Sequence, residues 1–512
     1  MRLARKLFVA ALLALGAAPT AEATWSIVLV DTATGEVAVG CATCLENFDL
    51  EVYCPVVLVG IGGACAQSSI DSNGRNRRLI WDELQLGTSP KQILSKLRNS
   101  DSSHQSRQYG IVDLKGREAT FTGTQAGAWA GGVTGVSGTI HYAIQGNVLT
   151  GQPVVADAEA ALLATPGDLA EKLMAAMEAA QAVGGDGRCS CDPSDADRCG
   201  APPPGFDPGS DKSAHVGFMI VARIGDTDGN CNVSAGCSTG TYYMDHNVAG
   251  QDRNDPDPVL QMRTLFDQWR DDWRGHADHL RSTQTMSRAG VPGNGTTPAT
   301  LTIALRDWED LPLLAGGATV TVAHSAASDG LSSIGSVVDH GDGTYSVELT
   351  AGVGQGRDEY VVVVDDGRGP VTLYPLPWLD HNETLRTDTT SLSAAAGGTV
   401  DFALFGPDEE PPADYLLLCS ASGTAPGLPI GSSGVVLPLN YDDLMWISFF
   451  CANTATFVNT DGVLDDAGKG NAQFHVEADE LSPLVGFDLS FAYLTNANVT
   501  FASNFKTIAI DP

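Results

Sequence analysis

The stretch Thr24-Trp-Ser-Ile-Val-Leu-Val-Asp31 decides the fold of the first half of the chain, because it has the pattern of a buried strand from its first residue. The polar turn Thr32-Ala-Thr-Gly-Glu36 follows, and Val37 to Ala42 returns as the second strand of a hairpin. Val56 to Ile61 and Ala64 to Ser68 indicate a further pair of strands. The sequence therefore predicts a domain that opens with two hairpins.

Blocks of helix and strand continue beyond these hairpins. A long helix rich in Ala, Leu, Met and Glu is expected over Asp157 to Val183, with a break at Thr165-Pro-Gly167. The order of the blocks predicts an α+β domain in which helices cover stacked antiparallel sheets. The other expected elements are helices over 76–86, 89–97 and 258–281, a hairpin over 109–122, and strands over 142–149 and 216–224.

The residues before Thr24 have the layout of a secretory signal peptide. A basic n-region precedes the apolar stretch Leu7 to Ala18, and Ala21-Glu22-Ala23 matches the small-x-small pattern that signal peptidase reads. An uncleaved anchor is the alternative, but about a dozen apolar residues fall short of the roughly 20 that span a bilayer. We therefore expect cleavage of residues 1–23, a mature chain that begins at Thr24, secretion to the extracellular or periplasmic space, and no membrane span.

Charge and cysteine content narrow the classes of partner. A formal net charge of −33 repels the phosphates of nucleic acid and of anionic lipids, so neither is an expected partner. The 11 cysteines of an exported chain predict disulfides, and their odd number leaves one free thiol or an intermolecular bridge. Because Cys419 and Cys451 stand apart from the others, we expect a bridge between them.

The cysteines nearest the N-terminus admit a second interpretation. Cys41-x-x-Cys44 with Cys54 and Cys65 offers four sulfur ligands to zinc. The second pair lacks the close spacing of a zinc ribbon, so disulfides are the favoured interpretation. No metal ligand is assigned among them.

A second candidate for an ion is the segment Asp226-Thr-Asp-Gly-Asn230. Asp226, Asp228 and Asn230 place oxygen atoms at alternate positions, as part of a calcium loop does, although the terminal bidentate glutamate of an EF-hand is missing. A surface loop pinned by neighbouring disulfides is the favoured interpretation, so no cofactor is expected. A structural calcium ion at this segment is the alternative.

Several further motifs follow the opening strand in order along the chain. They are Gly60-Ile-Gly-Gly-Ala-Cys-Ala-Gln67, Gln108-Tyr-Gly-Ile-Val-Asp113, Trp129-Ala-Gly131, Tyr142-Ala-Ile-Gln-Gly-Asn-Val-Leu149 and Gln181-Ala-Val-Gly-Gly-Asp-Gly-Arg188. Together with the opening strand they resemble the bacterial family called domain of unknown function 1028. Members of that family are similar to N-terminal-nucleophile hydrolases, so the resemblance implies a four-layer αββα sandwich, which we expect over residues 24–289. It implies no established substrate.

Thr24 at a mature N-terminus combines a nucleophile and a base in one residue. Its Oγ attacks a carbonyl carbon, and its α-amine, with a pKa of about 8, accepts the proton directly or through water. The resemblance places Thr24 at the nucleophile position. Proteasome-like enzymes of this clan add a lysine on an early strand, whereas residues 24–90 contain no lysine. Either another group tunes Thr24, or the fold has kept its shape without hydrolase activity.

The resemblance also indicates which polar residues surround Thr24. Asn147 is the candidate oxyanion donor, a role worth roughly 3 kcal/mol in other hydrolases. Asp186 and Arg188 are candidates for orienting the amine or for gripping a substrate carboxylate. A turn residue and a structural ion pair, respectively, are the alternatives for Asn147 and for the Asp-x-Arg pair. Gln67 and Gln145 are the further substrate-binding candidates.

Short strands and turns fill the sequence beyond Gly290-Val-Pro-Gly-Asn-Gly-Thr-Thr-Pro298, whose composition is that of a linker. Residues 299–380 contain Asp339-His-Gly-Asp-Gly-Thr-Tyr-Ser-Val-Glu-Leu349, which resembles filamin-type and bacterial immunoglobulin-like repeats. Residues 387–512 resemble a C-terminal β-module of secreted bacterial proteins. Two all-β sandwich domains are therefore expected after the first domain.

Two classes of function are open on this sequence. The first is a secreted amidohydrolase that attacks a small-molecule or peptide substrate with Thr24. The second is a non-catalytic binding protein, in which the first domain is a scaffold and the β-domains attach the chain to a cell surface or a glycan.

Overall fold

The computed structural model describes residues 24–192, 199–406, 413–495, 499 and 501–512. The chain divides into two compact units, which we call the N-terminal unit, ending at Asp272, and the C-terminal unit, beginning at Trp273. The predicted signal peptide, residues 1–23, lies outside the described residues. The division precedes the end of the predicted range 24–289, because Thr283–Met286 already pairs with a strand of the C-terminal unit.

Two antiparallel sheets form the middle of the N-terminal unit. The first is six-stranded, in the order β10-β9-β2-β1-β8-β7, and the second is four-stranded, in the order β3-β4-β5-β6. Strand β1 therefore lies in the centre of its sheet, as its unbroken run of buried residues requires. The bounds are β1 Thr24–Asp31, β2 Val37–Thr43, β3 Pro55–Leu58, β4 Gly62–Gln67, β5 Gln108–Asp113, β6 Arg117–Thr122, β7 Gly131–Ser137, β8 Ile140–Asn147, β9 Val216–Ala222 and β10 Met244–Val248.

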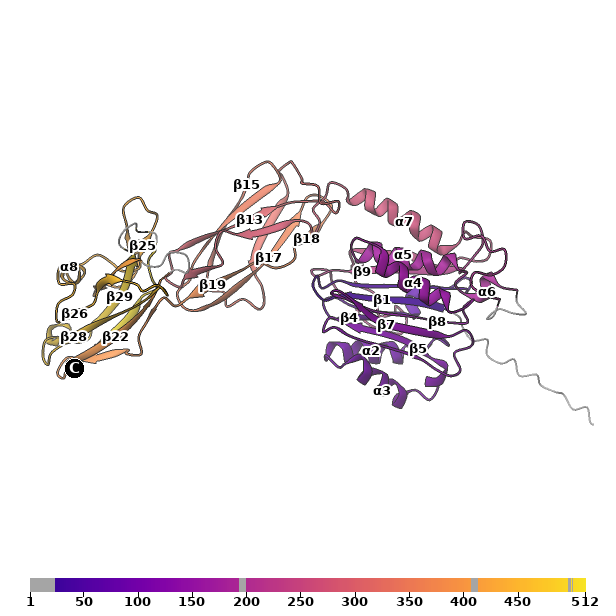
Figure 1. The fold of residues 1–512 in the computed structure, drawn as a ribbon, viewed down its shortest axis with the longest axis horizontal. Coiled ribbons are helices and arrows are strands. Elements are labelled where there is room, and N and C mark those ends of the chain that lie inside the picture. Colours follow the sequence, from indigo (N-terminus) through magenta and orange to yellow (C-terminus); the bar gives the residue numbers. More distant parts are fainter. Residues whose placement is uncertain (1–23, 193–198, 407–412, 496–498, 500) are drawn as a thin grey trace, which may run out of the picture. The chain divides into compact units, whose positions relative to one another are not determined.

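Helices pack on the two sheets of this unit (Figure 1). The long helix expected over residues 157–183 is broken as predicted, because α4 ends at Ala164 and α5 begins at Leu169. Asp168 starts α5 by accepting a 3.0 Å hydrogen bond from the backbone nitrogen of Glu171. The bounds are α1 Leu50–Tyr53, α2 Arg75–Gln85, α3 Pro90–Ser100, η1 His104–Ser106, α4 Pro153–Ala164, α5 Leu169–Ala182, α6 Gly187–Ser190 and α7 Pro258–Trp273.

Three apolar contacts join these elements. The two sheets share one core, in which Val28 and Val39 of the six-stranded sheet meet Val112 of the four-stranded sheet. Helices α2 and α3 pack on the outer side of the four-stranded sheet through a second cluster. Helix α5 packs so closely on β2 that a Cβ at Gly40 would lie 2.9 Å from Cδ1 of Leu173. The α+β class is confirmed.

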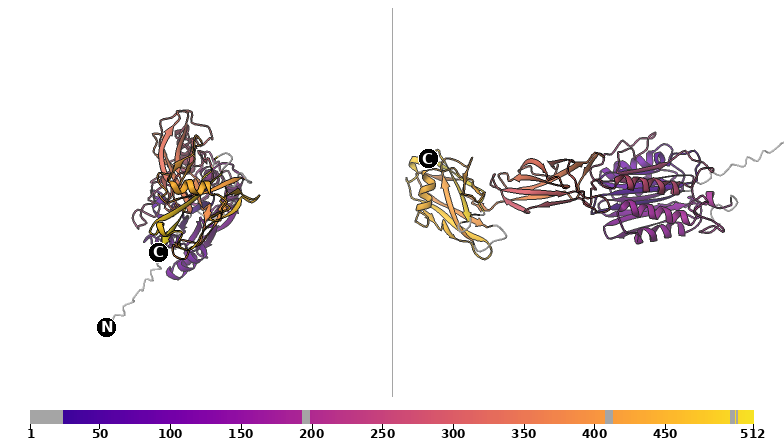
Figure 2. Two further views of the ribbon diagram at one scale, coloured as in Figure 1. Left: turned by 90° about the vertical axis from the view of Figure 1, so that its left-hand side faces the viewer. Right: turned by 90° about the horizontal axis from the view of Figure 1, so that it is seen from above.

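The C-terminal unit is built mainly of strands, as two further views show (Figure 2). Its first β-sandwich has sheets in the orders β11-β13-β16-β15 and β12-β19-β17-β14, with β18 beside β17. The predicted linker 290–298 is wrong, because Gly290–Pro292 pairs in parallel with β19. The bounds are β11 Thr283–Met286, β12 Gly290–Pro292, β13 Pro298–Ala304, β14 Thr319–His324, β15 Ser333–Asp339, β16 Thr344–Thr350, β17 Gly356–Asp365, β18 Pro370–Thr372 and β19 Trp378–Asn382.

The second β-sandwich follows from residue 385. Its sheets have the orders β20-β22-β28-β26 and β21-β30-β29-β23-β27, and β24 pairs with β25. Its main core gathers large residues of both sheets, among them Phe402 and Phe491. The bounds are β20 Leu385–Arg386, β21 Ser391–Ser393, β22 Gly398–Phe405, β23 Asp414–Ser420, β24 Leu428–Pro429, β25 Val436–Leu437, α8 Asp443–Phe450, β26 Phe457–Val458, β27 Asp461–Val463, β28 Lys469–Val476, η2 Ser482–Leu484, β29 Asp488–Thr495 and β30 Lys506–Asp511.

Among the residues that the structure describes, three disulfides are formed, and all of them lie in the N-terminal unit. The expected bridge between Cys419 and Cys451 is wrong, since both remain thiols. Cys419 lies on β23 and Cys451 follows α8, and each packs as a small apolar side chain in the same core. The three bridges are Cys44–Cys189, Cys191–Cys199 and Cys231–Cys237.

Candidate active site

Thr24 is the first residue of β1, and the structure buries it, with 1% of its surface exposed. Its partner across the ladder is Asn147, the last residue of β8. From the other sheet, the side-chain amide of Gln67 donates a 2.9 Å hydrogen bond to the Thr24 carbonyl. Three of the predicted site residues therefore meet at one end of the sheets.

The Thr24 hydroxyl is linked to a cation through one intervening residue. Its Oγ1 donates to Oγ1 of Thr43 at 3.2 Å, and Thr43 is the last residue of the neighbouring strand β2. Nη2 of Arg188 donates to the same Thr43 oxygen at 3.1 Å. The charged guanidinium of Arg188 therefore polarises the Thr43 hydroxyl, and this hydroxyl accepts the hydrogen bond from Thr24.

Asp186 holds that arginine in place. Its Oδ2 lies 2.8 Å from Nη2 of Arg188, and its Oδ1 accepts from the Arg188 backbone nitrogen at 3.0 Å. Oδ2 also accepts from the backbone nitrogen of Cys44 at 2.7 Å. Asp186 is fully buried, so an ion pair with several donors is what keeps its carboxylate there. It positions Arg188 and the residue after Thr43.

A disulfide ties the same two segments together covalently. Cys44, next to Thr43, is bonded to Cys189, next to Arg188, across 145 residues of sequence. The short helix α6 carries Arg188 and Cys189, and Asp186 is its N-cap. The Thr43–Arg188 contact is therefore fixed by a bridge and an ion pair together.

The end of β8 connects Asn147 to the Asp186 turn. The side-chain amide of Asn147 donates to the carbonyl of Ala126 at 3.0 Å. The next residue, Val148, has a φ of 50°, a left-handed conformation that a β-branched residue rarely adopts. Its carbonyl accepts from the backbone nitrogen of Gly187 at 3.0 Å. The backbone strain at Val148 is thus held by the loop that carries Arg188.

Gln145 lies deeper in the interior than the other predicted residues. It is paired with Ser26, and its Nε2 donates to the Ser26 hydroxyl at 2.6 Å and to the Ser26 carbonyl at 3.2 Å. These bonds connect β8 to β1 two residues beyond Thr24. The structure therefore does not place Gln145 beside the Thr24 hydroxyl.

Gln108 was not predicted from the sequence, and it supports Gln67. Its Oε1 accepts from Nε2 of Gln67 at 2.8 Å, and its own Nε2 donates to the carbonyl of Gly146 at 2.8 Å. It is fully buried between the sheets. Gln108 is the first residue of the motif Gln108–Asp113. Its place in a motif of the resemblance could have identified it as a site residue.

Two basic residues near Thr43 were also missed. His215 donates its backbone nitrogen to the Thr43 carbonyl at 2.9 Å. Burial, and then the charge of Lys212, lower the pKa of His215. Burial lowers the pKa of Lys212 as well. Both lie in the segment that leads into β9, and the lowered pKa of His215 keeps its imidazole neutral near pH 7.

In the segment considered for calcium, the carboxylates accept hydrogen bonds from backbone nitrogens. Oδ2 of Asp226 accepts from the backbone nitrogens of Arg223 and Tyr243, at 2.7 and 2.9 Å. Asp228 accepts from the backbone nitrogen of Val59 at 3.0 and 3.1 Å. Burial raises the pKa of both carboxyls. A calcium ion bound by Asp226, Asp228 and Asn230 stays a prediction.

The fold and the site define an α+β domain with a threonine at its first strand, followed by immunoglobulin-like β-sandwiches. Residues 24–194 match the model of a family described as a family of unknown function, DUF1028. Residues 278–371 match the model described as invasin, domain 3. The resemblance read from the N-terminal motifs is confirmed. A search of curated proteins found no match.

Several solved structures are similar to parts of the chain. Protein SPO2555 from Silicibacter pomeroyi, titled as a DUF1028 protein, is 19% identical over 48% of this chain and 85% of its own, with a TM-score of 0.35. The Yersinia pseudotuberculosis adhesin InvE is 19% identical over 46% of this chain and 60% of its own, with a TM-score of 0.17. The Escherichia coli adhesin FdeC is 11% identical over 79% of this chain and 92% of its own, with a TM-score of 0.20.

Proposed function

We propose that the N-terminal unit is an exported amide hydrolase of the N-terminal-nucleophile type, with Thr24 as its nucleophile. The observation that carries the proposal is the hydrogen-bond series from Thr24 through Thr43 to Arg188. It begins at the residue that signal peptidase would leave at the mature N-terminus. Two β-sheets sharing a core, with helices packed on each, support the inference that this unit is the αββα sandwich of such hydrolases.

The first chemical step joins Thr24 to the substrate. The Thr24 Oγ attacks the carbonyl carbon of an amide, and the hydroxyl proton passes to the free α-amine of the same residue, directly or through water. The tetrahedral intermediate collapses when the C–N bond breaks and the leaving nitrogen takes that proton. The products are a free amine and an ester between Thr24 and the acyl group.

Water completes the turnover. It adds to the ester carbonyl, gives one proton to the α-amine, and the bond to Oγ breaks as Thr24 recovers its proton. Negative charge develops on the carbonyl oxygen in both steps, and Asn147 is our candidate donor to it. Its place in that role is supported by its pairing with Thr24 across the ladder.

Arg188 takes the place that a lysine has in proteasome-like enzymes. Its guanidinium is two hydrogen bonds from the Thr24 oxygen, so its charge favours the deprotonated, attacking form of the hydroxyl. Asp186 positions Arg188, which is 21% exposed at its side chain and so lies at the edge of the buried cluster. That edge is where a carboxylate of a substrate would be bound.

Export is part of the proposal, because the mechanism requires a free Thr24 amine. Three disulfides are typical of a protein that matures in an oxidising compartment. Within the described residues, no helix is both long enough and apolar enough to cross a membrane.

The experiment that tests this step is sequencing of the N-terminus of the exported protein. We expect Thr24 as the first residue. An Ala23→Leu variant, which removes the small residue at the cleavage position, should retain the precursor and lose activity. A mature protein that begins at any other residue would overturn the proposal.

A second candidate function is attachment to a glycan through the second β-sandwich. Helix α8 exposes aromatic rings that pack on one another: Trp446 stacks on Phe450 with centroids 5.1 Å apart and planes 10° apart. Phe450 is 73% exposed. Flat apolar rings of this kind stack on the C–H faces of sugars, and the net charge of −33 favours a neutral polysaccharide.

Glycan attachment is tested by co-sedimentation of the full mature chain with insoluble neutral polysaccharides such as cellulose and chitin. We expect Trp446→Ala to weaken the binding constant about tenfold, the effect of roughly 1.4 kcal/mol. Trp378→Ala is the matched control, because Trp378 is a comparably exposed tryptophan on the first β-sandwich. Equal binding by both variants, or none by the unmodified chain, would contradict this candidate.

A further inference from the structure

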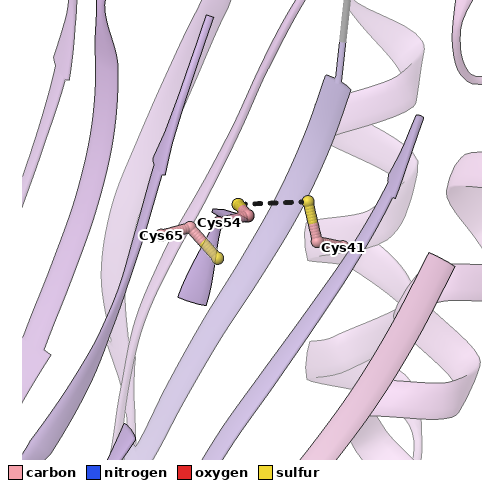
Figure 3. Close-up of side chains that lie close together, drawn as sticks. All are labelled: Cys41, Cys54 and Cys65. Carbon is pink, nitrogen blue, oxygen red and sulfur yellow. Dashed lines mark hydrogen bonds between the residues drawn. The ribbon is translucent and has the colours of Figure 1, made fainter. Parts of the chain in front are cut away.

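Three cysteines meet in the core between the two sheets of the N-terminal unit (Figure 3). Cys41 lies on β2, Cys54 directly follows α1, and Cys65 lies on β4. All three are fully buried, and their sulfur atoms lie within 4.8 Å of one another. The Cys41 and Cys54 sulfurs are 3.5 Å apart. None of the three belongs to a disulfide.

These separations fit one ion bound by all three sulfurs. A disulfide needs about 2.05 Å between its sulfurs. Zinc–sulfur bonds of about 2.3 Å at tetrahedral angles place neighbouring sulfurs about 3.8 Å apart, and trigonal binding places them about 4.0 Å apart. The observed 3.5 Å between Cys41 and Cys54 is near these values, and the outer limit of 4.8 Å needs little movement.

The backbone holds the three residues from both sheets. Cys41 is paired with Ser26 on one side and with Phe218 on the other. Cys65 is paired with Gly110 of β5, and the carbonyl of Cys54 accepts from the backbone nitrogen of Ala66 at 2.9 Å. Ligands fixed on paired strands form a preorganised site.

A buried cation, Arg77, lies near the cluster. Arg77 is 1% exposed and donates to the carbonyl of Val52 through Nη1. Within the described part of the chain, its Nε and Nη2 are buried and make no hydrogen bond. Val52 stands two residues before Cys54, so the guanidinium lies on the Cys54 side of the cluster. A buried guanidinium requires compensating negative charge, and thiolates at the cluster would add to the charge of the buried Asp71 carboxylate.

We propose that Cys41, Cys54 and Cys65 form a buried site for one thiophilic d10 cation, Zn(II) or Cu(I). Sulfur ligands select these ions over hard cations such as calcium or magnesium. Charge favours zinc, because a divalent ion offsets more of the charge of three thiolates than a monovalent ion does. The number of donors favours Cu(I), which is stable with three sulfurs, whereas a structural zinc ion takes four ligands.

One residue, Gln67, links the three-cysteine site to the candidate active site. Oε1 of Gln67 is 4.0 Å from the Cys41 sulfur, and Nε2 of Gln67 holds the Thr24 carbonyl. On zinc, Gln67 Oε1 would be our candidate for the fourth ligand. Occupancy of the site would therefore fix Gln67 and, through it, the first residue of β1. The metal site itself does not depend on hydrolase activity.

The first test loads the full mature chain, with its disulfides intact, with Cd(II) or with Cu(I) under anaerobic conditions. Native mass spectrometry should show one ion per chain, ultraviolet absorbance should show a thiolate-to-metal charge-transfer band, and the Tm should rise. The ion that survives competition by a chelator identifies the source as zinc-like or copper-like. No ion retained and no shift in Tm would overturn the proposal.

The second test uses variants with a matched control. Cys41→Ser, Cys54→Ser and Cys65→Ser should each lose the charge-transfer band, whereas Cys419→Ser, at a fully buried free thiol in the other unit, should keep it. A band that persists in Cys54→Ser contradicts the site. If a variant does not fold, alkylation of the unfolded wild-type chain tests whether the three cysteines are free. All three thiols must then react, and a mapped Cys41–Cys54 disulfide would overturn the proposed metal site.

Discussion

At the scale of single residues, the central feature is the hydrogen-bond series that links Thr24 to the Arg188 guanidinium. The Thr24 hydroxyl donates to Thr43, and Thr43 accepts from Arg188, which Asp186 holds at 2.8 Å. The proposed mechanism assigns separate tasks: Thr24 would attack, Thr43 would transmit charge, and Arg188 would supply it. Thr43 would then be a positioning residue, because its hydroxyl contacts that of Thr24.

Replacing Thr43 separates this role from packing. Thr43→Val keeps the shape of the side chain but removes the oxygen, and we expect the rate of Thr24 acylation to fall about tenfold, the effect of a lost hydrogen bond worth roughly 1.4 kcal/mol. Thr43→Ser keeps the oxygen and should retain most of the rate. The rates are measured with an activated ester and the Tm is recorded beside them. Equal rates in both variants would remove Thr43 from the series.

The residues of this site differ in how far the sequence revealed them. Thr24 and Asn147 stood in quoted motifs, and the pairing of their strands brings them together. Thr43 was missed because the predicted strand ended at Ala42. The next residue, Thr43, is the one whose hydroxyl accepts from Thr24. The assignment of Cys419 to a bridge failed for a different reason, since isolation in sequence does not show whether two thiols meet at bonding distance.

At the scale of structural elements, the loop of α6 is what completes the site. It carries Asp186 and Arg188 to the end of β2, where the Cys44–Cys189 disulfide fastens it. The strained backbone at Val148 is bonded to the same loop. The order of helices and hairpins in the first domain was predictable from periodicity, whereas this loop contact joins segments 145 residues apart and was not.

Removal of that disulfide tests the role of the loop. Cys44→Ser with Cys189→Ser opens a loop of 145 residues, for which chain entropy predicts a loss of stability of up to about 5 kcal/mol. We expect a lower Tm and slower Thr24 acylation. The control removes the Cys191–Cys199 bridge, which closes a separation of 8 residues and should cost much less. A larger loss of Tm in the control than in the Cys44/Cys189 variant would contradict the account.

A second element, the turn before β15, makes the first β-sandwich sensitive to acid. Burial by itself raises the pKa of Asp358, but hydrogen bonds from Ser332, Leu331 and Ser328 outweigh it and hold that pKa well below its usual range. Burial lowers the pKa of His381, which contacts Asp358 at 3.1 Å. Asp358 makes its full contribution to the free energy of unfolding above the pKa of an unfolded aspartate, about 3.9. His381 makes its full contribution above the pKa of an unfolded histidine, about 6.5.

Both contributions are lost as the pH falls through those values towards the lowered folded pKa values. We expect the free energy of unfolding of the C-terminal unit to decrease from pH 7 to about pH 2, through His381 below about 6.5 and through Asp358 below about 3.9. Asp358→Asn should destabilise the sandwich at pH 7 by about 2 kcal/mol and flatten the acid limb. Urea unfolding across this range measures both effects. An acid limb that is unchanged in Asp358→Asn would show that other groups carry it.

At the scale of the whole molecule, one proteolytic cut has two consequences. Cleavage after Ala23 would release the chain for export and would create the amine beside the Thr24 hydroxyl. The strand-built region after Trp273 adds exposed aromatic rings on α8 that suit attachment. The sequence predicted the α+β class and the strand-rich C-terminal region from periodicity and turns. The linker expected over 290–298 was wrong, because this stretch rich in Gly and Pro begins with strand β12.

The most direct test of the central claim is the reaction of the mature, folded chain with a β-lactone, followed by intact mass and peptide mapping. We predict one added probe per chain, located on Thr24, retained in Thr24→Ser and absent in Thr24→Ala. Folded protein that begins at Thr24 and gains no adduct, or an adduct that persists unchanged in Thr24→Ala, would contradict the account.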